Sequence, residues 1–594
     1  MPKTLDQLLD SVPSYEERED LIALVKQLAA QTRKFGLVWE DKPEEVAELC
    51  ETKLPVLNEV VERHIERNGD ATADSLLGDD GSNLPTHLII EGDNYHALSV
   101  LNYTHAGKVD VIYIDPPYNT GSASWKYNNK IVDKEDLFRH SKFLSFMYKR
   151  LELAKYLLTH DGIIIVAIDD YEVHSIRFIL DELFGEENRL ATCVVVHNPG
   201  GRQDDRFFAT AHEYMLVYSP HKQEAQIGFL EITEEKASQY NQQDEFGRYK
   251  LRSLIRTGAN SRPVDRPNLY YPIYVNPENL DIAVEKTKGW IELLPKDSSG
   301  ADRVWRWSPP SLMEQKEKYI TCKKIKNGYA LFVKEREDDN KGYKPKTLWN
   351  KPNYSSATAI GLLKTIFAAS HRAIFDYPKS ADLMRDILKI TSKPNSTILD
   401  FFAGSGTTGH AVLELNTSDG GNRQFILCTN NENGIAANVT HPRIKKVIEG
   451  YGDKEPIPAE VRYFRTEFVE KDEDDITDAV RHELVERATD MLKIRENTFT
   501  LVEQKIKRGK RQFEIYTNVA QTKYTAVIYD TVAIECAKAK LHRLAHPVAI
   551  YIFTLGDDRY ESDFDEPNWN VEPLPERILQ VYKRLFAKRK KKNS

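Results

Sequence analysis

The segment Val109–Thr120 constrains the fold more than any other part of the sequence. It starts with a run of apolar and β-branched residues, Val109–Ile114, which is typical of a strand buried on both faces of a parallel sheet. The run stops at Asp115-Pro116-Pro117-Tyr118, because proline lacks an amide hydrogen and cannot continue a central strand or a helix. Since open α/β sheets bind ligands at the carboxyl ends of their strands, the sequence predicts a binding site at this tetrapeptide.

The tetrapeptide Asp115–Tyr118 offers a carboxylate, main-chain carbonyl groups and one aromatic ring. This set of groups suits a planar base that carries an exocyclic amine. We expect the amine to donate to Asp115 and to the Pro116 carbonyl oxygen, and the base to stack on Tyr118. The alternative for Tyr118 is an aromatic residue at the rim of the site with a purely structural role.

Strands and helices alternate on both sides of this segment, which predicts a doubly wound α/β sheet. The further expected strands are Leu88–Ile90, Gly162–Ile168, Tyr214–Tyr218 and Thr397–Asp400, and the expected helices include 141–160 and 381–390.

The α/β pattern is interrupted between residues 223 and 370, where turns, aromatic residues, lysines and arginines prevail. Apolar residues before position 72, such as Val56, Val60 and Ile65, recur at helical spacing. The predicted regions are a helical N-terminal region (1–80), the first part of the α/β fold (81–222), an insert (223–370), the second part of the α/β fold (371–455) and a C-terminal α+β region with a basic tail (456–594).

The distribution of charge matters more than the net charge of −9. Acidic residues dominate the first 80 positions, whereas the insert carries an excess of lysine and arginine suited to phosphate contacts. No apolar run is long enough to span a bilayer, and the five cysteines show no paired spacing. We therefore expect a cytoplasmic protein with reduced cysteines and no membrane partner. His197, His212 and His371 lack metal-ligand spacing, and no metal site is expected.

A second motif, Asp400–Gly409, lies between an expected strand and an expected helix. Its glycines allow a tight turn and close approach of the backbone to a ligand, and the following helix adds free N–H groups. No lysine follows Gly404-Ser405-Gly406, which argues against a phosphate loop of the ATPase type. A purely structural turn is the alternative for this motif taken alone.

The ordered pair of motifs resembles the β class of amino-methylating DNA methyltransferases. The Asp115–Tyr118 motif comes first, the Phe402-x-Gly404-x-Gly406 motif second, and a basic insert between them resembles a target-recognition domain. The continuation Asn119–Gly121 and the segment Leu269–Val275 look like those of the modification subunit of type III restriction–modification systems.

The resemblance implies S-adenosylmethionine as the cofactor and a flipped adenine held by Asp115, Pro116, Pro117 and Tyr118. The implied cofactor residues are Gly404 and Gly406, which approach it, Asp400 and Phe402, which shape its pocket, Asp93 near its adenine, and Pro378 and Lys379 on its methionine side. One departure concerns the ribose, because Thr429-Asn430-Asn431-Glu432 follows the strand that normally leads to an acidic residue. We assign this role to Glu432, with Asn431 as the alternative.

The implied activity is methylation of the 6-amino group of adenine at a specific site in double-stranded DNA. A homodimer and a separate restriction subunit with helicase and nuclease activities are the implied partners. Alternatives are methylation of the 4-amino group of cytosine, a DNA-binding specificity protein without catalysis, and an RNA substrate. Candidate phosphate contacts are Arg252, Arg256, Arg262, Arg266, Lys323, Lys324, Lys326, Lys341, Lys344 and Lys346.

Overall fold

The computed structural model divides the chain into two compact units, residues 1–227 with 346–594, and residues 228–345. The structure describes residues 42–67, 85–119, 126–127, 130–131, 136–232, 234–326, 328–339, 342–368, 375, 377–471, 476–554, 560–564 and 566–590.

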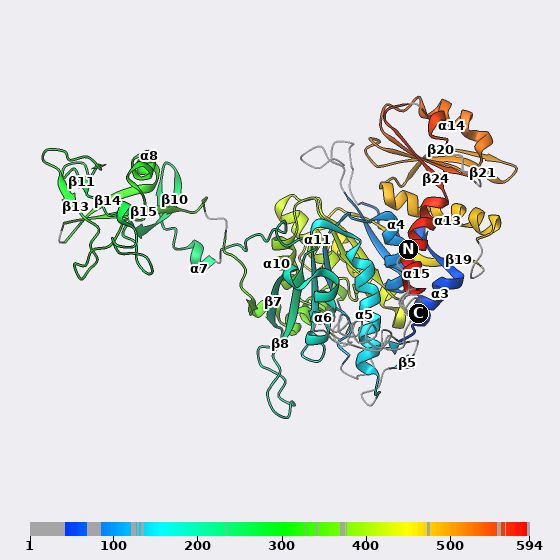
Figure 1. Ribbon diagram of the computed structural model, residues 1–594, viewed down its shortest axis with the longest axis horizontal. Helices are drawn as coiled ribbons and strands as arrows, with labels where there is room; N and C mark the ends of the chain where they lie inside the picture. Colours follow the sequence, from blue (N-terminus) through cyan, green and yellow to red (C-terminus); the bar gives the residue numbers. More distant parts are fainter. Residues whose placement is uncertain are drawn as a thin grey trace, which may run out of the picture. The chain divides into compact units, whose positions relative to one another are not determined.

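A ten-stranded sheet forms the centre of the larger unit (Figure 1). From one edge to the other its strands are β1 (Lys53–Glu59), β19 (Glu460–Glu470), β2 (Thr86–Glu91), β18 (Gln424–Thr429), β17 (Thr397–Asp400), β3 (Val109–Ile114), β6 (Leu158–Ile168), β8 (His212–Tyr218), β7 (Arg189–Val196) and β16 (Leu348–Trp349). The strands from β19 to β6 are parallel, while β8 is antiparallel to both of its neighbours. The α/β class predicted from the sequence is confirmed as a large mixed sheet.

Alternate residues of the central strands face two different helical layers, as the period of a strand requires. Ile426 and Cys428 of β18 belong to the core formed with α4 (Asn94–Thr104), α5 (Arg139–Lys155) and α6 (Val173–Phe184). Leu427 faces α11 (Thr407–Asp419), since a Cβ added at Gly409 would lie 2.9 Å from its Cδ1. The helices packed with α11 are α10 (Ala381–Thr391), α12 (His441–Glu449) and, against α12, α9 (Ser356–Phe367).

The chain changes direction across the sheet between β17 and β3, which lie side by side with Ile398 opposite Val111. From β17 the chain passes through α11 to β18, and from β3 it passes through α5 to β6 on the other side. Such a switch point is where an open sheet holds ligands beyond the carboxyl ends of its strands. The fold therefore brings Asp115 and Asp400 to neighbouring strand ends.

The N-terminal region differs from the predicted run of helices. Helix α3 (Glu45–Thr52) is followed directly by β1, which pairs antiparallel with β19 along its whole length. Val56 and Leu57 are buried there, so pairing with the sheet outweighs the apparent helical spacing. Residues 1–41 and 68–84, which include most of the predicted helical region, lie outside the described residues.

The insert forms its own unit around a small apolar core that includes Leu254, Ile273, Trp305 and Leu312. Its elements are α7 (Glu234–Ala237), α8 (Pro309–Tyr319), a sheet of β14 (Ile320–Ile325), β15 (Gly328–Arg336), β10 (Gly247–Ser253) and β9 (Gln242–Asp244), and a sheet of β12 (Ile282–Ala283), β11 (Ile273–Val275) and β13 (Ile291–Leu293). The predicted boundary at 370 was too late, because residues 346–368 add strand β16 to the large sheet and helix α9 against α12.

The C-terminal region has a second sheet, with strands β20 (Thr500–Lys507), β21 (Lys510–Thr517), β22 (Tyr524–Ile528), β23 (Val548–Phe553) and β24 (Trp569–Leu574). Its helices are α13 (Asp478–Glu496), α14 (Ile534–Leu541) and α15 (Glu576–Lys590). Strand β19, whose residues fall within the predicted C-terminal region 456–594, belongs to the large sheet.

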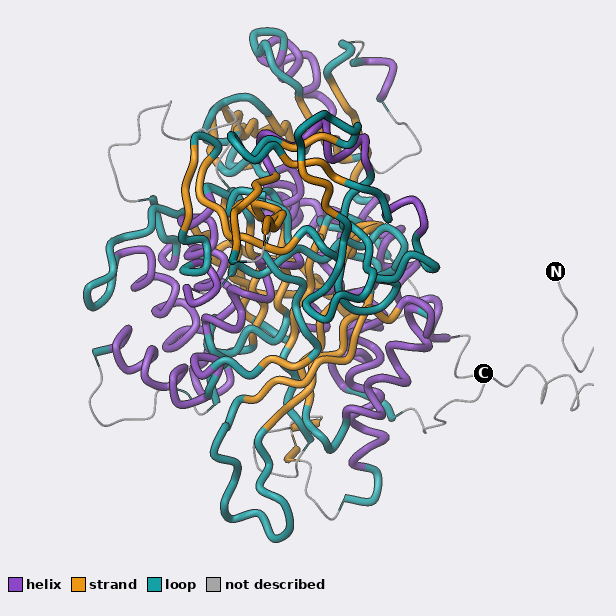
Figure 2. The backbone as a smooth tube through the Cα atoms, turned by 90° about the vertical axis from the view of Figure 1, so that its left-hand side faces the viewer, coloured by secondary structure: helices purple, strands orange, loops and turns teal. Residues whose placement is uncertain are grey.

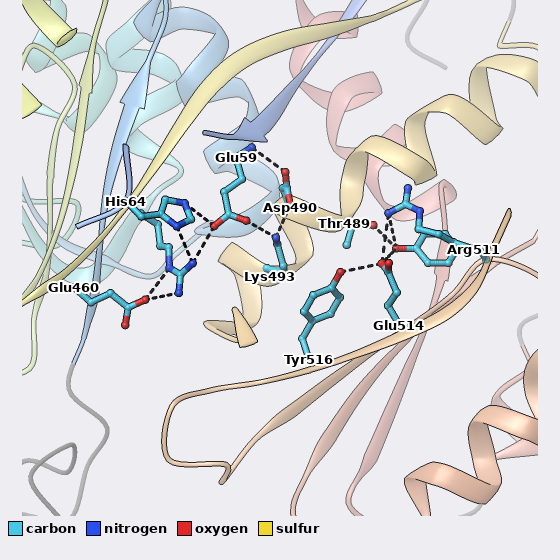
Figure 3. Close-up of polar contacts among 11 residues, drawn as sticks. Glu59, His64, Glu460, Thr489, Asp490, Lys493, Arg511, Glu514 and Tyr516 are labelled. Atoms are coloured by element: carbon cyan, nitrogen blue, oxygen red, sulfur yellow. Dashed lines mark hydrogen bonds and ion pairs between the residues drawn. The ribbon is translucent and has the colours of Figure 1, made fainter. Parts of the chain in front are cut away.

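Polar contacts of α13 join the two sheets (Figure 3). Lys493 lies 2.5 Å from Glu59 of β1 and 2.7 Å from Asp490, while Thr489 contacts the Tyr529 hydroxyl at 2.6 Å. Among the described residues, no helix is long and apolar enough to cross a membrane.

Candidate active site

The motif Asp115–Tyr118 leaves the end of β3 and meets residues from two distant segments. The Tyr118 hydroxyl donates to Asp115 Oδ1 at 2.7 Å, and Lys379 Nζ lies 3.2 Å from the same oxygen. Lys379 comes from the loop before α10, so the predicted residues Asp115, Tyr118 and Lys379 are together in the structure.

A residue that the sequence did not reveal, Glu213, completes this cluster. Its Oε2 lies 2.6 Å from Lys379 Nζ and 2.9 Å from the Tyr118 hydroxyl, and its side chain is only 4% exposed. Glu213 lies near the start of β8, whose antiparallel direction brings its first residues to the edge where β3 ends. The only signal in the sequence was a carboxylate directly before the expected strand Tyr214–Tyr218.

Two carboxylates thus share one ammonium group. Burial raises the pKa of Asp115 and Glu213 adds to this effect, whereas Lys379 opposes it. Burial also favours a neutral Glu213, but Lys379 and His197 hold the pKa of Glu213 below its ordinary value. The two carboxylates in turn raise the pKa of Lys379 against the effect of its burial. The arrangement therefore retains a charged Lys379 between an ionised Glu213 and the more easily protonated Asp115.

The Tyr118 side chain is anchored by its hydroxyl, and its ring is partly exposed. Lys379 Nζ lies 5.0 Å from the ring centroid. Pro116 is buried and Pro117 half-buried, so the two prolines fix the turn that carries the ring. Stacking of a base on Tyr118 remains a prediction.

The glycine motif forms the turn between β17 and α11. Gly404 and Gly406 have φ values of +48° and +78°, a region that glycine adopts without the steric cost of a Cβ. Gly406 is the N-cap of α11 and leaves the first turn without a side-chain cap, and Thr440 Oγ1 donates to the Gly404 carbonyl at 2.6 Å. The turn therefore presents main-chain N–H groups at the carboxyl edge of the sheet.

The buried carboxylate of Asp400 stabilises this turn through hydrogen bonds. Its carboxylate accepts from Phe402 N at 3.0 Å and from Thr408 Oγ1 at 2.5 Å, and burial raises its pKa to about 7. Phe402 is partly buried and packs 5.9 Å from the Phe146 ring. These contacts fix the glycine turn, and the role of Asp400 and Phe402 in shaping a cofactor pocket remains a prediction.

Asp93 follows β2 at the same edge and caps α4 by accepting from Tyr95 N at 2.7 Å. The buried Arg150 donates to Asp93 at 3.1 Å and forms an ion pair with Glu44 at 2.8 Å. Asn94 donates to the Phe401 carbonyl at 3.0 Å, which ties the end of β2 to the glycine turn. Asp93 is therefore fixed in place while its side chain stays 31% exposed.

Glu432 lies beyond the end of β18, two strands away from β3. The neighbouring Asn431 uses its side-chain oxygen to accept from Ala437 N at 3.1 Å, whereas Glu432 is half-buried. All predicted site residues therefore come from the carboxyl edge of β2, β18, β17 and β3, or from the Pro378-Lys379 segment beside it.

A DNA methylase family of N6 and N4 methyltransferases matches residues 109–437. The chain belongs to this family. The type II methyltransferase M.KpnI of Klebsiella pneumoniae is 36% identical over 342 residues, which are 57% of this chain and 79% of M.KpnI. The EcoPI Mod subunit of a type III restriction–modification enzyme from Escherichia phage P1 is 34% identical over 376 residues, 58% of each chain. The crystal structure of the M1.HpyAVI–SAM complex shares 14% identity over 60% of this chain and 98% of that one, with a TM-score of 0.27.

These relatives confirm the resemblance predicted from the two motifs. The chain is a DNA methyltransferase of the N6/N4 family related to type III modification subunits. The matching region spans little more than half of the EcoPI Mod subunit.

A second polar cluster, which the sequence did not predict, holds the segment directly after the Asp115–Tyr118 motif. Asn119 donates to Glu172 Oε1 at 2.5 Å, and His140 Nδ1 lies 2.6 Å from the same oxygen. Glu172 is fully buried just before α6, and Asn119 has a φ of +50°, which asparagine tolerates better than most residues. The cluster thus holds the chain directly after Tyr118.

Proposed function

We propose that this chain transfers a methyl group from S-adenosylmethionine to the 6-amino group of adenine in a specific sequence of duplex DNA. The observation that supports this most is the juxtaposition of Asp115–Tyr118 and Gly404–Gly406 at the ends of the neighbouring strands β3 and β17. When bound, S-adenosylmethionine supplies an electrophilic methyl group on a sulfonium.

The residues at the edge of the sheet fit the polar groups of this cofactor. The uncapped first turn of α11 offers N–H groups, and the half-exposed carboxylate of Asp93 and the half-buried one of Glu432 can accept from hydroxyl or amine groups. We assign the ribose to Glu432, whose carboxylate follows β18 at the same edge of the sheet, with Asn431 as the alternative. Lys379, and Pro378 directly before it, lie next to the Asp115–Tyr118 motif.

The amine of adenine is a poor nucleophile because its lone pair is conjugated with the ring. Hydrogen bonds from both amine protons to Asp115 and the Pro116 carbonyl favour a pyramidal nitrogen with a more available lone pair. Lys379 contacts Glu213 more closely than Asp115, so Glu213 retains the ammonium when the amine takes its place on Asp115. Positioning then provides much of the acceleration, and the base must leave the duplex to reach the site.

Cytosine carries a similar exocyclic amine, and the family includes methyltransferases of both kinds. Asp rather than Ser at position 115 favours adenine. The intact Asp115–Tyr118 and Gly404–Gly406 motifs argue against a specificity protein that has lost catalysis.

We further propose that the chain acts as a homodimeric modification subunit of a type III-like system, with a separate restriction partner. Support comes from its similarity to the EcoPI and StyLTI Mod subunits. The unit 228–345, with its lysines and arginines, is proposed to select the DNA site.

The decisive experiment combines the purified chain with labelled S-adenosylmethionine and DNA from a host without modification. We expect Asp115→Ala to lower transfer at least about 100-fold while affinity for S-adenosylhomocysteine, measured by calorimetry, is kept. The matched control is Asp453→Ala, which removes an exposed carboxylate far along the chain. Full activity of Asp115→Ala would refute the site assignment.

Single-molecule sequencing of DNA from cells that express the chain identifies the modified base and its site. We expect 6-methyladenine at a single motif, on one strand only. 4-Methylcytosine would establish the alternative substrate, and modification of both strands would argue against the type III role.

A further inference from the structure

The loop 197–211, which connects β7 to β8, lies at the active-site edge of the large sheet. Strand β6 runs toward this edge, β8 runs antiparallel to β6, and β7 runs antiparallel to β8, so β7 ends and β8 begins there. His197, the first residue of the loop, has its Nδ1 3.9 Å from Glu213 Oε2. The loop thus begins and ends beside the cluster of Asp115, Tyr118 and Lys379.

The base of this loop is well defined by hydrogen bonds. Asn198 N donates to the Ala211 carbonyl at 3.1 Å, and Arg202 N donates to the Thr210 carbonyl at 3.0 Å. Asp205 accepts from Thr210 N at 2.8 Å. A Cβ at Gly201 would lie 2.6 Å from Ala209 Cβ, so only glycine permits the two sides of the loop to approach this closely. The two sides of the loop therefore continue the pairing of β7 and β8 beyond the sheet.

The tip of the loop exposes two neighbouring aromatic side chains. Phe207 is 83% and Phe208 90% exposed, the highest values for any phenylalanine in the described part of the chain. Arg206 lies 5.2 Å from the Phe207 ring, and Arg202 is also exposed, as is Asp204. Beyond the labels β7 and β8 the loop projects downward in Figure 1, and Figure 2 shows it again as the lowest loop of the tube.

Exposed aromatic side chains beside the active site suit one step of the proposed reaction, the extrusion of the target base from the duplex. Extrusion of the target base removes stacking from its neighbours and leaves a gap in the duplex. Apolar side chains that enter between base steps fill such gaps in bent or distorted DNA, and aromatic rings stack on any base because every base has a flat face. Arginines beside the rings suit the phosphates that flank the gap.

We propose that Phe207 and Phe208 insert into the DNA duplex beside the target base and occupy the space that the extruded base leaves. This inference rests on the proposed function, because it presumes a duplex substrate with a buried target. It assigns to the loop 197–211 the opening of the duplex, a role distinct from the chemistry at Asp115 and from site selection by the insert.

The test uses the full chain, the DNA site mapped by sequencing, and two substrates. One is the intact duplex, and the other has the same target adenine already unstacked, opposite an abasic position. We expect the double variant Phe207→Ala with Phe208→Ala to lower kcat/KM about 10- to 100-fold on the intact duplex and to leave the abasic substrate nearly unaffected. Phe207→Trp with Phe208→Trp restores transfer to the intact duplex, since tryptophan also stacks.

The matched control is Phe178→Ala, which removes a 43% exposed phenylalanine from the outer side of α6. A second readout is the fluorescence of 2-aminopurine at the target position, which rises when the base leaves the stack. We expect this rise with the unaltered chain and with Phe178→Ala, but a much smaller one with the double alanine variant.

The outcomes separate the two proposals. Equal activity of the unaltered chain and the double variant on intact duplex, or an equal loss on both substrates, would overturn the assignment of the loop while leaving the proposed function standing. Absence of transfer by the unaltered chain to either substrate, with no fluorescence rise, would overturn both.

Discussion

Lys379 is shared between two carboxylates, and this sharing decides how Asp115 can act. The ammonium lies 2.6 Å from the buried Glu213 and 3.2 Å from the more exposed Asp115. A lone lysine beside Asp115 would compete with the substrate amine for its oxygens. Because Glu213 offers a second and closer anchor, Asp115 can exchange Lys379 for an amine without leaving a buried cation unpaired.

The variant Glu213→Gln tests this positioning role. Asp115 accepts from the amine only when it is ionised, so the rate falls as the pH drops through its pKa. Removal of the Glu213 charge takes away one contribution that raises the pKa of Asp115, so the acid limb of kcat/KM moves to lower pH. Lys379 is then left with Asp115 alone, and we expect the plateau rate near neutral pH to fall about tenfold. The measurement is the pH profile of methyl transfer.

A glutamate outside the cluster provides the control for this variant. Glu224 is 56% exposed and pairs only with His160 among the ion pairs of the described residues, so Glu224→Gln should leave the pH profile as it is. An acid limb of Glu213→Gln that stays where it is in the unaltered chain would contradict the role given to Glu213.

At the scale of elements, two strand–loop motifs far apart in sequence form one site because their strands are parallel neighbours. Parallel strands end at the same edge of a sheet, so the order of strands alone brings Asp115 and the glycine turn together. The glycine turn also begins α11, whose two ends are both capped by glycines with positive φ, Gly406 at the N-cap and Gly420 at the C-cap.

These two caps allow a matched comparison of alanine variants. A Cβ at Gly406 would lie 3.2 Å from Thr440 Cγ2, whereas a Cβ at Gly420 would meet nothing within 4 Å. Each variant forces alanine into the left-handed region at a cost of about 1 kcal/mol, so both should lower the melting temperature slightly. We expect only Gly406→Ala to weaken binding of S-adenosylhomocysteine, by about tenfold or more, in calorimetric titrations. Equal affinities of the two variants for S-adenosylhomocysteine would show that the glycine turn is not part of the cofactor site.

The same scale shows what the sequence could and could not predict. The ends of β3 and β17 were predicted correctly because apolar runs that stop at Asp115 or Asp400 carry a local signal. Glu213 was missed because periodicity does not tell the direction of a strand, and only the antiparallel course of β8 brings its first residues to the site. Strand β1 was mistaken for a helix because its partner β19 lies about 400 residues later and leaves no local trace.

At the scale of the whole molecule, the insert is a module with its own core and closely spaced ends. Leu230 and Tyr343 pair with each other as an isolated antiparallel bridge, so the chain enters and leaves the unit at nearly the same point. A module of this kind can be gained or lost without a change in the order of the surrounding strands. Under the proposed function, the chemistry and the choice of DNA site reside in separately folded parts of one chain.

Replacement of residues 230–343 by a short Gly-Ser linker tests this separation. The bridge between Leu230 and Tyr343 shows that a few residues can span the cut, and the elements that hold Asp115, Lys379 and Gly406 all lie outside it. We expect the shortened chain to melt cooperatively and to bind S-adenosylhomocysteine like the full chain, but to methylate the mapped site at least about 100-fold more slowly. The control carries the same linker inserted after Gly300, within an exposed turn of the intact insert. Continued methylation of the same site by the shortened chain would show that residues outside 230–343 read the DNA sequence, while loss of cofactor binding would show that the two units are not independent.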